Sequence, residues 1–203
     1  MRHNFSKTFG QSNQRVDLKS GEKAIFGYGS LISVTSLERS LKRRYDGPFM
    51  ACALEGWQRS WDVVMPNEKF YANIDSGRLY PKNILYLNIQ SHPYMLLAGV
   101  LFVVTANELE ELDQREWIYD RKVITKQLRG VHLTGGNAYT YIAKPEWIMT
   151  NITTPGLAAI RMSYLELLEA GFQELGDSFR TAYNRSSHAM PQHLVIKDFY
   201  DQR

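Results

Sequence analysis

A carboxylate at the end of a clearly signalled helix is the first candidate for chemistry in this sequence of 203 residues. Thr105 and Glu108 have the spacing of a capping box, which predicts a helix that begins at residue 106. Leu109, Leu112 and Glu116 then recur at intervals of three and four residues, so they share one stripe of that helix. Glu116 therefore occupies a core-facing position in the last helical turn, where an apolar residue would be expected.

A partly buried Glu116 would be suited to proton transfer. Burial disfavours the charged carboxylate and raises its pKa, and the negative end of the helix dipole acts in the same direction. Asp113, three residues earlier, would add a like charge if ionised. A carboxyl group with a raised pKa can act as a general base or acid near neutral pH. The position fits equally well a structural glutamate paired with Arg115, Arg121 or Lys122.

A glycine-containing turn is the second candidate. The run Phe26-Gly-Tyr-Gly-Ser-Leu-Ile32 follows a short apolar stretch that predicts a strand. Glycines allow a sharp turn, and successive free N–H groups in such a turn can hold an anion. The run lacks the Gly-Lys-Ser/Thr ending of a nucleotide phosphate loop, and Ile32 stands where a dinucleotide fingerprint has its third glycine. A plain strand-to-helix turn explains the spacing as well.

Five tyrosines are further candidates because each could line a pocket and donate a hydrogen bond. Ordinary strand packing is the alternative interpretation for aromatic residues of this kind. These tyrosines are Tyr28, Tyr119, Tyr139, Tyr141 and Tyr164.

Composition excludes several other classes of protein. The single cysteine, Cys52, lies in an apolar run and is expected to be a buried small hydrophobe, which leaves no disulfide and no cysteine-based zinc site. The five histidines are dispersed, so we expect neither a metal nor a cofactor. The formal charge of +3 is small and gives no case for a nucleic-acid partner. No apolar stretch is long enough to cross a membrane and no secretory signal is visible, so we expect a cytoplasmic protein.

The elements that must position these residues are those of an α+β domain. We expect a flexible polar tail over residues 1–23 and one domain over 24–203. Strands dominate the middle of the chain and helices its last quarter, whereas residues 65–83 are rich in turn-forming residues and are expected to be a loop excursion. The expected strands cover 24–28, 50–57, 59–64, 84–89, 98–104, 119–128 and 138–143, and the expected helices 34–44, 106–116, 164–174 and 177–183.

Two motifs in this order resemble a known family. The sequence GYGSL at 27–31, directly after the first strand, is similar to the opening signature of gamma-glutamylcyclotransferase-like proteins. Three further features resemble the second block of that family. They are the strand GVLF at 99–102, the L-D-x-x-E run at 112–116 and the aromatic Tyr119. Tyr141 and the run 155–171 resemble its C-terminal part, so that the resemblance covers roughly residues 24–185.

The resemblance implies a small mixed β-barrel with flanking helices and a central cavity. Enzymes of the family release 5-oxoproline from gamma-glutamyl amines or peptides without a cofactor. The catalytic glutamate of the family falls on Glu116. The loop that holds the substrate falls on Tyr28, Gly29, Ser30 and Leu31, and aromatic residues that contact the substrate fall on Tyr119 and Tyr141.

Three functions fit these observations. A gamma-glutamyl cyclotransferase with Glu116 as general acid and base comes first. A non-catalytic protein that binds a small carboxylate in the same cavity comes second, and a nucleotide- or phosphate-binding protein that uses the loop at 27–31 comes third. The segment after Ile32 lacks the extended motif expected of the glutathione-specific branch, so glutathione is less favoured. The leaving amine and the oligomeric state stay open.

Overall fold

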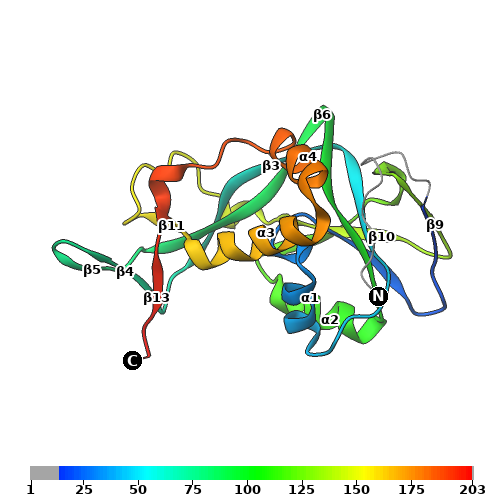
Figure 1. The fold of residues 1–203 in the computed structure, drawn as a ribbon, viewed down its shortest axis with the longest axis horizontal. Helices are drawn as coiled ribbons and strands as arrows, with labels where there is room; N and C mark the ends of the chain where they lie inside the picture. The colour runs from blue at the N-terminus through cyan, green and yellow to red at the C-terminus, as the bar shows by residue number, and fades with distance from the viewer. Residues whose placement is uncertain (1–13, 203) are drawn as a thin grey trace.

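The computed structural model describes residues 14–202 and confirms the α+β class, with a mixed sheet that curls strongly into a half-barrel and four α-helices in the described residues (Figure 1). The helices are α1 (Val34–Leu41), α2 (Ala106–Arg115), α3 (Met162–Leu175) and α4 (Asp177–Arg185). The strands of the main sheet are β2 (Lys23–Gly27), β3 (Phe49–Pro66), β6 (Asn83–Val104), β7 (Tyr119–Val123), β8 (Leu128–Arg129), β10 (Ala138–Ala143), β11 (Ala158–Arg161) and β12 (Val195–Ile196). The remaining strands are β1 (Gln14–Asp17), β4 (Phe70–Ile74), β5 (Gly77–Leu79), β9 (Val131–Thr134) and β13 (Asp198–Tyr200).

The long strand β6 organises the main sheet. It pairs antiparallel with β3 from Phe102 opposite Phe49 to Asn83 opposite Pro66, and it also pairs with β2 and β11. The order β12-β11-β6-β2-β10-β7 places β2 between β6 and β10, with β10 parallel to it. Two register irregularities in β3 help to curl the sheet, because bulges increase its local twist. The GYGS turn therefore begins at the end of a central strand.

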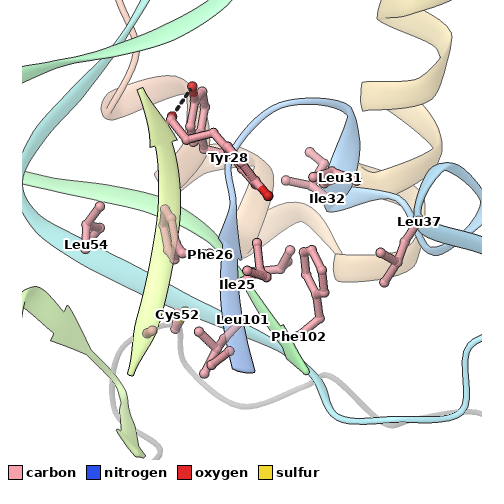
Figure 2. Packing of buried hydrophobic residues seen from close by; sticks show 14 of the residues in the cluster. Ile25, Phe26, Tyr28, Leu31, Ile32, Leu37, Cys52, Leu54, Leu101 and Phe102 are labelled. Atoms are coloured by element: carbon pink, nitrogen blue, oxygen red, sulfur yellow. Dashed lines mark hydrogen bonds between the residues drawn. The ribbon is translucent and has the colours of Figure 1, made fainter. Parts of the chain in front are cut away.

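Apolar side chains from β2, β3 and β6 fill the core beside this turn. Ile25 and Phe26 project to opposite sides of β2 (Figure 2), and both are buried. Leu31, Ile32 and Leu37 continue the core on the side of α1. Cys52 is fully buried in the same core, as its apolar neighbours predict, and burial raises the pKa of its thiol.

The helix that carries Glu116 begins where the sequence predicts. The side-chain oxygen of Thr105 accepts a hydrogen bond from the backbone N–H of Glu108, and the Glu108 carboxylate accepts one from the N–H of Thr105, which is the complete capping box. Leu109 and Leu112 are buried, so the predicted apolar stripe faces the core. Glu116 follows directly as the C-cap residue.

Over residues 14–23, the structure differs from the flexible tail predicted for residues 1–23. Residues 1–13 lie outside the described part of the chain, but Gln14–Asp17 form β1, which pairs parallel with β9. Val16 and Leu18 are buried there. Two apolar side chains and a distant backbone partner thus order a segment whose polar composition gave no strand signal.

The excursion at 65–83 is also more regular than expected. It contains the β4–β5 hairpin, and β4 pairs with β13 from the other end of the chain. In Figure 1 this three-stranded sheet lies at the left end of the molecule, and β9 lies at the right end. The strand expected over 119–128 ends at Val123, because a short 3-10 helix occupies Thr125–Gln127. None of the helices between residues 14 and 202 has the length and apolar character needed to cross a bilayer.

Candidate active site

A cavity of about 260 Å³ lies at the end of β2. All seven residues that the family resemblance assigns to catalysis or substrate binding line it, although they come from three distant segments. They are Tyr28, Gly29, Ser30, Leu31, Glu116, Tyr119 and Tyr141. Of the five candidate tyrosines, Tyr164 lines the cavity as well, whereas Tyr139 packs under the guanidinium of Arg121 and is not among its lining residues.

The loop of the cavity is built by a tight turn after β2. A 3-10 helix covers Ser30–Ile32, with hydrogen bonds from the N–H of Ile32 to the carbonyl of Gly29 and from the N–H of Ser33 to the carbonyl of Ser30. The N–H groups of Ser30 and Leu31 open this turn and have no acceptor within it. A Cβ atom at Gly29 would come within 2.9 Å of the Tyr164 hydroxyl oxygen, so the missing side chain lets the loop and α3 approach closely.

A buried arginine fixes the backbone of this loop. The carbonyl of Tyr28 accepts hydrogen bonds from Nε of Arg59, at 2.9 Å, and from the hydroxyl of Tyr183, at 3.0 Å. The hydroxyl of Tyr28 in turn donates to the carbonyl of Tyr141, at 2.8 Å. Arg59 is fully buried and also donates to the carbonyls of Ala98 and Tyr183. Both ends of Tyr28 are therefore held by hydrogen bonds to other protein groups, which restrains the loop.

Glu116 lies at the wall of the cavity, at the end of α2. Its side chain is 17% exposed, and burial raises the pKa of its carboxyl group, as the helical stripe predicts. The guanidinium of Arg115, with Nη1 2.9 Å from Oε1 of Glu116, acts in the opposite direction and lowers that pKa. The structure therefore contains both features expected from the sequence, a buried carboxyl group and its pairing with Arg115.

Asp113 is engaged by Tyr141 and Arg121 rather than by groups next to Glu116. Its carboxylate accepts a hydrogen bond from the hydroxyl of Tyr141, at 2.8 Å, and another from Nη1 of Arg121, at 2.5 Å. In the L-D-x-x-E run, the aspartate thus holds β10 through Tyr141 and β7 through Arg121, and the glutamate lines the cavity.

The tyrosines form walls whose hydroxyl protons are already committed to protein acceptors. Tyr119 donates to the carbonyl of Leu87, at 2.8 Å, and Tyr141 to Asp113. Burial raises the pKa of Tyr28, Tyr119 and Tyr141, so these groups stay neutral. Their rings shape the cavity, and their hydroxyl oxygens remain able to accept hydrogen bonds.

Sequence reasoning missed one side of the cavity. Met65 and Tyr86 come from the ends of the long β3–β6 pair, Trp117 follows Glu116, and Arg161 ends β11. Tyr86 packs edge-to-face on Tyr164, with ring centroids 5.3 Å apart. The sequence signal for this side is the aromatic composition of the 65–94 segment, which contains Phe70, Tyr71, Tyr80, Tyr86 and Tyr94. Among residues 14–202, no group of three or more His, Cys, Asp or Glu side chains could hold a metal ion.

Comparison with solved structures decides the fold. A gamma-glutamyl cyclotransferase matches over 80% of this chain and 85% of its own, with a TM-score of 0.53 and 11% identity. The chain has the gamma-glutamyl cyclotransferase fold. The cyclotransferase from yeast that is specific to glutathione shares this fold over 85% of this chain and all of its own, with a TM-score of 0.51 and 11% identity. YkqA from Bacillus subtilis shares it over 84% of this chain and 57% of its own, with a TM-score of 0.53 and 14% identity.

The likeness is one of fold, because every identity in these comparisons is low. No sequence-family profile matches the chain, and no curated protein sequence matches it. Within the gamma-glutamyl cyclotransferase fold, the cavity described above combines a glycine turn, a buried carboxyl group and two arginines.

Proposed function

We propose that this protein is a gamma-glutamyl cyclotransferase, which releases 5-oxoproline and a free amine from a gamma-glutamyl amide. The observation that carries the proposal is the placement of Glu116. A mostly buried carboxyl group with a raised pKa lines the same cavity as the turn at 28–31. Perturbed carboxyl groups in a cavity are typical of proton-transfer sites.

The reaction needs one group that can accept a proton from the α-nitrogen of the substrate and then donate it to the leaving nitrogen. The α-ammonium group of the substrate cannot attack until it loses a proton, which the Glu116 carboxylate would accept. The freed nitrogen then forms a bond to the γ-carbonyl carbon, and the five-membered ring closes. When the bond to the leaving nitrogen breaks, Glu116 returns the proton to that nitrogen, and a second proton from the ring nitrogen ends on the departing amine. Positioned acid–base groups of this kind typically contribute about 10²–10⁴-fold to the rate.

The loop would hold the substrate in a curled conformation. In this proposal the N–H groups of Ser30 and Leu31 would bind either the substrate carboxylate or the oxygen that becomes negative during ring closure. Because Arg59 and Tyr183 already fix the Tyr28 carbonyl, little ordering remains to be done when the substrate binds. Intramolecular attack then lowers the activation barrier, since both reacting groups belong to one molecule and are held close together.

A second candidate function is the binding of a small carboxylate without turnover. The contact between Arg115 and Glu116 favours it, because a glutamate held by an arginine can be purely structural. Burial of the Glu116 carboxyl group at the cavity wall favours the catalytic function instead. A protein that only binds carboxylates would gain nothing from a carboxyl group at this position.

The test is release of 5-oxoproline from a panel of gamma-glutamyl dipeptides, gamma-glutamyl amines and glutathione. We expect the wild-type protein to release 5-oxoproline from at least one member, and loss of that release in Glu116→Gln. If no member reacts, but calorimetry shows that the compounds bind, the second candidate function is correct instead.

A further inference from the structure

The cavity has a second arginine, and it is engaged very differently from Arg115. Arg115 is held between Glu116 and Ser30, with Nη1 2.9 Å from the carboxylate and Nη2 3.0 Å from the Ser30 hydroxyl oxygen. Arg161 lines the cavity from the end of β11, where α3 begins. Figure 1 shows β11 toward the end of the molecule that carries β4 and β13, away from α2.

Among the described residues 14–202, the guanidinium of Arg161 makes only long hydrogen bonds. Nη1 lies 3.4 Å from the Ser163 hydroxyl oxygen and Nη2 lies 3.3 Å from the Tyr86 hydroxyl oxygen, whereas Nε is buried with no partner. Charged donors usually bond at about 2.7–2.9 Å. The side chain is nevertheless only 17% exposed. A nearly buried cation with unused donors costs free energy until an acceptor binds.

The nearest carboxylate does not use these donors. Oδ2 of Asp198 lies 3.9 Å from Nη1 of Arg161, which is beyond hydrogen-bond distance. Both oxygens of Asp198 accept from Ser163 instead, one from its N–H at 2.9 Å and the other from its hydroxyl at 2.6 Å. Asp198 therefore balances the charge of Arg161 in part, but it accepts no hydrogen bond from the N–H groups of the guanidinium. The ring of Phe70 stacks on one face of the guanidinium group, with 4.0 Å between the ring centroid and the guanidinium carbon.

We propose that Arg161 binds a carboxylate on the leaving group, so that the substrates are gamma-glutamyl amino acids or peptides rather than gamma-glutamyl amines. This inference rests on the proposed function. The α-amine and α-carboxylate of the gamma-glutamyl part share one carbon atom, so both stay near Glu116 and the loop. A carboxylate that reaches the β11 side of the cavity therefore belongs to the part of the substrate that departs. The planar fork of arginine is matched to a carboxylate.

Gamma-glutamyl-alanine and gamma-glutamyl-ethylamine test this assignment, because they differ only in the leaving-group carboxylate. For wild-type protein we expect kcat/KM to be about 10- to 100-fold higher for the alanine compound, the range for hydrogen bonds to a charged group. Arg161→Gln should remove that preference, with a much larger loss of kcat/KM for the alanine compound than for the ethylamine compound, and Arg161→Lys should retain part of the preference. Arg78→Gln is the matched control, because Arg78 also stacks on an aromatic ring, that of Tyr71 at 4.4 Å, but does not line the cavity.

Two results would overturn the assignment: equal kcat/KM for the two compounds in wild-type protein, or an equal loss for both in Arg161→Gln and Arg161→Lys. Binding of the two compounds to Glu116→Gln, measured by calorimetry, separates this inference from the proposed function. If wild-type protein turns over neither compound, the proposed function fails. Tighter binding of the alanine compound that depends on Arg161 would still support the carboxylate site, and equal binding would refute it.

Discussion

Arg115 contacts the carboxylate of Glu116 from the adjacent position in the chain, with 2.9 Å between Nη1 and Oε1. The same guanidinium donates to the hydroxyl of Ser30, so it links the end of α2 to the loop after β2. Burial raises the pKa of Glu116 and Arg115 limits that rise. The arginine thus sets two properties of the site together, the proton affinity of the carboxyl group and its position relative to the loop.

Removal of Arg115 should move the pH profile of the reaction. In Arg115→Gln the opposing positive charge is lost, so the pKa of Glu116 rises further above its ordinary value. Because the general base must be deprotonated in the free enzyme, the acidic limb of kcat/KM should shift to higher pH. Initial rates across the pH range test this, with exposed Arg39 on α1 replaced by Gln as a control. An unchanged limb would show that Glu116 is not the group that titrates.

The stability of the protein should depend on pH through Glu116. A free glutamate has a pKa of about 4.3, and the folded protein raises the pKa of this one. The folded state therefore binds the proton more tightly, and the stability that this provides is complete below the unfolded-state pKa and disappears as pH rises through the folded-state pKa. The free energy of unfolding of wild type relative to Glu116→Gln should fall over that interval. Urea denaturation at a series of pH values measures it, and a constant difference would contradict the burial argument.

Arg59 should be needed for the stability of the loop. In Arg59→Met the carbonyls of Tyr28, Ala98 and Tyr183 each lose a hydrogen bond from a charged donor, and one such bond contributes about 1.5–3 kcal/mol. We expect a loss of at least about 2 kcal/mol in the free energy of unfolding, together with a raised KM, because the Tyr28 carbonyl keeps only the Tyr183 hydroxyl as a donor and the loop is held less firmly. Chemical denaturation and substrate titration measure the two effects. Exposed Arg185 at the end of α4, replaced by Met, should show neither, and a similar result for both variants would refute the role given to Arg59.

The parts of the site that could be predicted from sequence are those encoded locally. The capping box at Thr105 sets the start of α2, and helical periodicity then places Glu116 on the buried stripe. The glycines around Tyr28 likewise predict a turn at the end of β2. In both cases a few neighbouring residues determine the backbone, so the side-chain direction follows from spacing alone.

Arg161 could not be predicted in this way because its surroundings come from distant segments. Tyr86 lies on β6, Phe70 on β4 and Asp198 on β13, and only the tertiary pairing of β4 with β13 brings them together. The strand β1 was missed for the same reason, since its partner β9 lies more than a hundred positions further along the chain. Non-local pairing of this kind has no signature in the periodicity of one segment.

The central claim is that Glu116 transfers the proton during ring closure, and Glu116→Gln tests it most directly. The amide keeps the shape of the side chain but cannot shuttle a proton. With a gamma-glutamyl dipeptide as substrate, we predict that kcat for 5-oxoproline release falls by at least about 10², whereas the dissociation constant of the substrate changes little. Wild-type activity in a folded Glu116→Gln protein would contradict the account and assign the chemistry to another group in the cavity.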